Sequence, residues 1–84
     1  MTVYVVILET ESVTEVCGVY ATPEAAEEYV RSNYHREYEA YKRAGHVLAE
    51  GENVDPPSEF GATIYMGTND FWIWGIHQCE VVTR

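Results

Sequence analysis

A chain of 84 residues in which 46% are apolar can bury one small core, so the sequence predicts a single folded domain over residues 1–84 and argues against disorder. Fourteen carboxylates against five Lys or Arg give a formal charge of −9, which repels phosphate backbones and attracts basic surfaces. Direct nucleic-acid binding is therefore the function that the composition favours least.

The N-terminal apolar run and the cysteine content argue against a membrane or metal role. Val3 to Leu8 is too short to cross a bilayer and has no basic region ahead of it, so it is neither a signal peptide nor a membrane span. Cys17 and Cys79 supply neither a disulfide framework nor a metal ribbon. We expect a soluble cytoplasmic protein with no metal, no cofactor and no membrane partner.

The first predicted elements form a hairpin. Residues 3–8 (VYVVIL) are β-branched and apolar on both faces, which is typical of a central strand. Residues 9–15 mix carboxylates with Thr and Ser, as in an exposed hairpin tip. Residues 13–21 then predict the return strand.

A long helix follows the hairpin. Thr22 predicts the N-cap and Pro23 the first helical position, with carboxylates in the first turns. Apolar residues recur at intervals of three and four, forming a stripe wide enough to lie on a sheet: Ala26, Val30, Tyr34, Tyr38, Tyr41 and Ala44. Gly45 predicts the end, although a helix continuing to Ala49 would cost only about 1 kcal/mol for the glycine.

The second half predicts a loop and two strands. Residues 51–61 contain adjacent prolines, which predict a long irregular acidic loop. Residues 62–66 predict a short strand, 67–70 (GTND) a turn and 71–82 a long closing strand. The predicted fold is α+β, a single four-stranded, mostly antiparallel sheet (β-β-α-β-β) with one long helix packed on one face.

The first half also resembles a known group of proteins. VYVVILE, an acidic turn and VCGVYATPEAAEEYV are similar to short β-β-α-β proteins from bacterial, archaeal and phage genomes, whose hairpin leads into a "GVY-T-EEA" helix start. The resemblance covers residues 3–30 and, loosely, 71–82. It implies a fold, and the group has no assigned activity.

The strand at 71–82 (FWIWGIHQCEVV) is apolar on both faces in its first half. Trp72 and Trp74 share one face, opposite Phe71 and Ile73, yet the chain has one helix to cover them. One interpretation leaves the Trp face open as a partner-binding surface and predicts a homodimer across it. This surface comprises Trp72, Trp74, Ile76 and Tyr4. The alternatives are that the acidic loop covers it, or that the helix does and Phe71 and Ile73 face outward.

The carboxylates concentrate in two segments of the sequence. They are Glu9, Glu11 and Glu15 at the hairpin tip, and Glu50, Glu52, Asp55 and Glu59 in the loop. These clusters predict docking on a basic partner, and the alternative is two solvated loops.

Side chains that could carry catalysis are few and scattered. His77 and Cys79 share a strand face and Cys17 could join them, but isolated thiols on strands are usually small buried hydrophobes. No nucleophile lies in a known motif. We therefore predict no catalytic residue and a non-enzymatic protein-interaction module, as in an accessory or inhibitory protein of a phage or mobile element. A dimeric domain with an aromatic ligand pocket and an enzyme centred on His77 are the alternatives.

Overall fold

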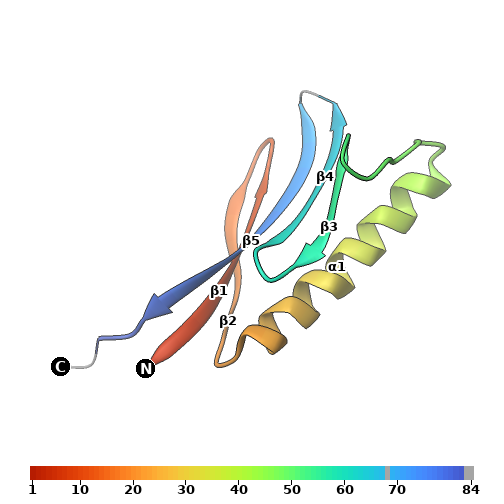
Figure 1. Ribbon diagram of the computed structural model, residues 1–84. Helices are drawn as coiled ribbons and strands as arrows, with labels where there is room; N and C mark the ends of the chain where they lie inside the picture. Colours follow the sequence, from red (N-terminus) through yellow and green to blue (C-terminus); the bar gives the residue numbers. More distant parts are fainter. Residues whose placement is uncertain (68, 83–84) are drawn as a thin grey trace.

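The computed structural model describes residues 1–67 and 69–82, and in this part of the chain it forms a five-stranded sheet with one helix. The elements are β1 (Thr2–Thr10), β2 (Thr14–Tyr20), α1 (Pro23–Arg43), β3 (Val54–Ser58), β4 (Gly61–Gly67) and β5 (Asp70–Glu80). The helix lies along one side of the twisted sheet (Figure 1). The α+β class is confirmed, and the predicted number of four strands is wrong by one.

The strand order is β2-β1-β5-β4-β3, with every neighbouring pair antiparallel. The last strand, β5, inserts between β1 and β4 and occupies the centre of the sheet (Figure 1). It pairs with β1 along the length of β1, from Thr2 opposite Glu80 to Thr10 opposite Trp72. This position gives both β1 and β5 a hydrogen-bonded neighbour on each side.

The additional strand is β3, within the segment predicted to be irregular. Val54 and Asp55 pair with β4, and pairing resumes only at Ser58, so Pro56 and Pro57 fall in the irregular part of the ladder. Prolines are tolerated there because β3 is an edge strand, whose outward groups need no sheet partner. The prolines therefore limit the regularity of the strand without preventing it.

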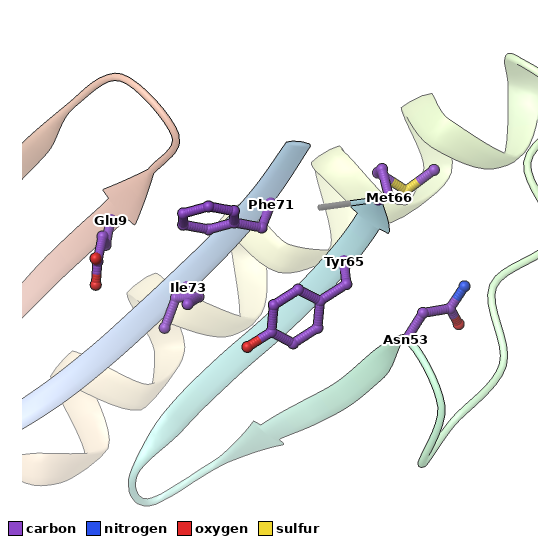
Figure 2. A pocket seen from close by; sticks show the side chains of 7 residues that line it. Glu9, Asn53, Tyr65, Met66, Phe71 and Ile73 are labelled. Carbon is purple, nitrogen blue, oxygen red and sulfur yellow. The ribbon is translucent and has the colours of Figure 1, made fainter. Parts of the chain in front are cut away.

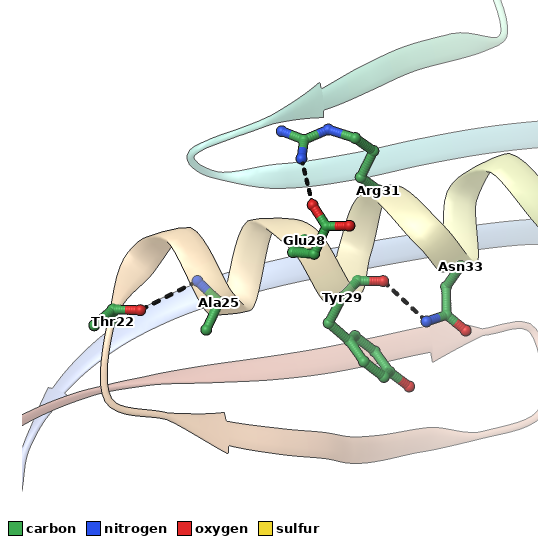
Figure 3. Close-up of polar contacts among 6 residues, drawn as sticks. All are labelled: Thr22, Ala25, Glu28, Tyr29, Arg31 and Asn33. Carbon is green, nitrogen blue, oxygen red and sulfur yellow. Dashed lines mark hydrogen bonds and ion pairs between the residues drawn. The ribbon is translucent and has the colours of Figure 1, made fainter.

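The limits of α1 are those that the local chemistry predicts. Thr22 accepts a hydrogen bond from the Ala25 amide at 3.2 Å and Pro23 is the first helical residue (Figure 3). The alternative continuation to Ala49 is not adopted. Gly45 has φ of +94°, and its amide donates to the Lys42 carbonyl at 3.0 Å, which ends the helix.

The remaining boundaries differ little from the prediction. β5 starts at Asp70 and ends at Glu80, two residues before the predicted end. The predicted turn at 67–70 joins β4 to β5, and its residue Thr68 lies outside the described residues. No helix in the described ranges is long and apolar enough to cross a membrane.

The core lies between α1 and the sheet. Ala26 and Val30 of the helix are fully buried, and Tyr34 is 7% exposed. They pack on side chains from four strands: Val6, Leu8, Val54, Ala62, Ile64 and Trp74. One helix therefore covers one face of the sheet, and within the described residues the other face has no helix over it.

Candidate interaction surfaces

The predicted apolar partner surface is part of the core. Trp74 is 2% exposed, stacks on Trp72 with ring centroids 5.6 Å apart and meets the edge of Tyr34 at 6.3 Å. Tyr4 and Ile76 also pack against the buried cluster. The interpretation that left these side chains open is wrong, because the helix covers them. The aromatic ligand pocket considered above stays a prediction, because Tyr4 and Ile76 also line a hollow with Phe60.

The register of the sheet explains why these side chains share the helix side. Leu8 pairs with Trp74, and Trp74 with Ala62 on the next strand, so three apolar side chains lie in one row beneath α1. Directly opposed residues point to the same face of a sheet. The large Trp rings therefore fill the space under the Tyr-rich helix.

The opposite side of the sheet carries a second apolar surface, which we call the open face. It comprises Val5, Ile7, Val16, Val19, Tyr65, Phe71 and Ile73. None of these belongs to the buried cluster or packs against it. Val16, Val19 and Tyr65 are 64%, 60% and 43% exposed. Phe71 and Ile73 are half-buried by neighbouring strands, and their outward orientation is one of the alternatives that the sequence left open.

Part of the open face is hollowed where β1, β5 and β4 meet. The hollow has a volume of about 760 Å³, and Figure 2 shows Phe71, Ile73 and Tyr65 around it with Glu9 to one side. Tyr65 and Phe71 lie opposite each other in the ladder, with ring centroids 6.3 Å apart. Its walls are largely apolar, with the Glu9 carboxylate and the Asn53 amide as its polar side chains.

The two predicted acidic clusters lie at different edges of the sheet. Glu11 and Glu15 belong to the β1–β2 hairpin, whereas Asp55 and Glu59 lie on β3 and in the turn that follows it. Because β2 and β3 are the two edge strands, the clusters do not merge into one patch. All seven predicted carboxylates are exposed: Glu9, Glu11, Glu15, Glu50, Glu52, Asp55 and Glu59.

The cations of the chain are concentrated on α1. The sequence places every Lys and Arg except Arg84 within the helix, where they stand among five carboxylates. Three of them pair with helix carboxylates: Arg31 with Glu28 at 2.9 Å (Figure 3), Lys42 with Glu39 at 3.8 Å and Arg36 with Glu37 at 3.8 Å.

The carboxylates outside the helix lack such partners. Within residues 1–67 and 69–82, the one charged contact to a carboxylate outside the helix joins the Met1 amine to Glu80 at 3.4 Å. None of the seven predicted carboxylates is ion-paired in this part of the chain. Within the described residues, no cation therefore balances the negative charge of these seven carboxylates.

One buried group responds to this charge. Burial, followed by the proximity of Tyr38, Glu50 and Asp55, raises the pKa of Tyr34 to about 12. Negative charge nearby disfavours the phenolate, as does loss of hydration. Glu50 and Asp55 therefore influence a group within the core.

The residues considered for metal binding or catalysis are not brought together. His77 and Cys79 lie on exposed positions of β5, whereas Cys17 packs against the helix-covered core. Among the described residues, no group of three metal-ligating side chains is present. The geometry gives no support to an enzyme centred on His77.

The orientation of the sheet is the main feature that the sequence interpretation missed. A signal was available in β4, where Ala62, Ile64 and Met66 form an apolar side, and Thr63 and Tyr65 a more polar one. Matching the apolar side of β4 with the Trp side of β5 would have placed both under the helix.

Comparison with known proteins adds no assignment. No protein-family model matches the chain, and neither a curated protein nor a solved structure matches it. The resemblance stated for residues 3–30 therefore stays a prediction.

Proposed function

We propose that the protein is a non-enzymatic interaction module that docks on the basic surface of a protein partner through the carboxylates outside α1. The observation that carries the proposal is the separation of charge. Three of the four helix cations pair with helix carboxylates, while the seven carboxylates on the hairpin, loop and β3 have no cationic partner among the described residues. A basic partner would supply the missing countercharge.

The contact would be governed by charge rather than by a deep site. Exposed carboxylates at a rim accelerate encounter and select a positively charged partner, and each pair adds little affinity alone. Occupying a basic surface is how an accessory or inhibitory protein of a phage or mobile element could act. This role requires no catalytic group and no cofactor.

The proposal is tested with a lysine-rich peptide as the probe, by fluorescence anisotropy at 50 and 300 mM NaCl. We expect binding that weakens at least tenfold at the higher salt, because charges are screened within about 10 Å at 0.1 M. Replacing the β3-side carboxylates by their amides should abolish most binding; these are Glu50, Glu52, Asp55 and Glu59.

A matched variant carries the same change of charge on the helix. It replaces Glu24, Glu28, Glu37 and Glu39 by Gln. This variant should keep most of the affinity, because Glu28, Glu37 and Glu39 are already paired with helix cations. Equal losses in both variants, or binding indifferent to salt, would contradict the proposed surface.

A further inference from the structure

We infer that the open face is a homodimer interface, in which two copies pack sheet face on sheet face about a two-fold axis. This inference is independent of the proposed acidic docking, which uses other residues. It begins from the apolar character of the face. Val16, Val19 and Tyr65 are substantially exposed, and neither Phe71 nor Ile73 packs against the buried cluster beneath the helix. Apolar patches larger than a few hundred Å² usually mark association sites.

The size of the face meets the requirement of a stable dimer. Five strands spaced about 4.8 Å apart, with a typical length of seven or eight residues, span roughly 19 by 25 Å, or about 500 Å². Two such faces would remove about 1,000 Å² from solvent, near the lower limit for a specific interface. The aromatic pair Tyr65 and Phe71 supplies the type of side chain that dominates interface energy.

The occupant is a second copy rather than a basic partner because this side of the sheet offers little charge. Of the carboxylates on the described strands, only Glu9 and Asp55 share this side, and Asp55 lies on edge strand β3. A basic surface would gain few ion pairs here. A two-fold contact places the same apolar surface on both sides of the interface, so neither copy needs a charged partner there.

The edges of the sheet argue against the other way of joining two copies. Edge-to-edge pairing needs a row of free amides and carbonyls, yet Pro56 and Pro57 remove two amides from β3. On the other edge, the register of β2 shifts between Val16 and Gly18. Such irregular edges discourage strand addition. Packed faces, about 10 Å apart with strands crossing at about 30°, remain the available geometry.

The inference predicts an unusual response to salt. The acidic edges of two copies repel one another across the contact, so screening should tighten the dimer. Sedimentation equilibrium of the full chain at 5 to 500 μM should therefore show a monomer–dimer equilibrium that shifts toward dimer between 50 and 500 mM NaCl. Docking on a basic probe responds in the opposite direction, so the two proposals can fail separately.

Point mutations test whether the open face is the dimer interface. Ile73→Lys should weaken dimerisation at least 100-fold, because it buries a charge at the centre of the contact. Ala40→Lys makes the same change of charge on the exposed side of α1 and should leave the dimer intact. Val19→Lys, at a position 60% exposed, should also weaken the dimer and provides a variant that keeps the fold if Ile73→Lys does not. Circular dichroism checks folding.

Three results would overturn the inference. A wild-type monomer at 500 μM at every salt concentration would show that the face serves another occupant, such as an apolar ligand or a different protein. A dimer that survives both Lys variants would place the contact elsewhere. A dimer that dissociates as salt rises would show that charge, not apolar burial, holds it.

Discussion

Trp74 lies on β5 at the centre of the sheet and packs against the helix. Because it is buried, its mutation is expected to lower the stability of the fold. Its ring is 2% exposed and contacts Trp72 and Tyr34. We predict that Trp74→Ala lowers the free energy of unfolding by about 3–5 kcal/mol, because truncation leaves a large cavity. This is a large part of the 5–15 kcal/mol typical of a domain. A Trp74→Ala variant of unchanged stability would contradict the helix-covered arrangement.

Urea unfolding followed by far-ultraviolet circular dichroism measures this change without depending on Trp fluorescence. Val47→Ala is the control, because Val47 is 87% exposed and its truncation should change the unfolding free energy by less than about 0.5 kcal/mol.

The raised pKa of Tyr34 predicts how the free energy of unfolding changes at alkaline pH. Its pKa is raised from the ordinary value of 10.0 to about 12 in the folded chain. The unfolded chain therefore loses this proton first as pH rises, so the stabilisation is complete below pH 10 and is lost between about pH 10 and 12. A shift of this size corresponds to roughly 2–3 kcal/mol.

Tyr34→Phe should therefore show a smaller fall in unfolding free energy between pH 10 and pH 12 than the wild type. Urea titrations at intervals across this range measure the slope. Tyr4→Phe, at a half-buried position outside the open face, controls for loss of a hydroxyl elsewhere. Equal slopes in wild type and Tyr34→Phe would assign the alkaline loss to other groups.

At the scale of elements, the β3–β4 hairpin depends on the close approach of Gly61 to β5. Gly61 has φ of +127°, and a Cβ there would overlap the Trp74 carbonyl oxygen. Its partner in the ladder is Gly75. We predict that Gly61→Ala destabilises the fold by more than about 2 kcal/mol, because it combines backbone strain with a clash that the central strand cannot relieve.

Gly51→Ala separates these two effects. Gly51 also has a positive φ, of +82°, but a Cβ there would meet nothing within 4 Å. Its substitution should cost about 1 kcal/mol from backbone strain alone. Thermal unfolding of both variants measures the difference, and similar losses would show that contact with β5 is unimportant.

At the scale of the whole molecule, one helix cannot cover two apolar sheet faces. The side of the sheet that carries Trp72 and Trp74 is packed beneath α1, and the open face is on the opposite side. Exposed carboxylates lie near the two edge strands. The two associations that we propose would use different surfaces, with a second copy on the open face and a basic partner at the acidic edges. Their opposite responses to salt follow from that separation.

Local chemistry in the sequence was sufficient to predict the position of the helix and of most strands. Thr22, Pro23 and Gly45 act within a few residues of themselves, so the helix ends could be predicted without knowledge of the rest of the chain. The exposure of the acidic segments could be predicted for the same reason, because unpaired carboxylates are costly to bury.

Only the tertiary structure decided which strand became an edge and which face became the core. Adjacent prolines exclude a central strand but permit an edge strand, and strand order determines which applies at Pro56. Side chains alternate along a strand, so Trp74 and Ile73 must lie on opposite faces. Because both faces of this strand are apolar, the sequence pattern does not show which face meets the helix. That choice depended on the Trp and Tyr side chains that α1 and four strands could bury together.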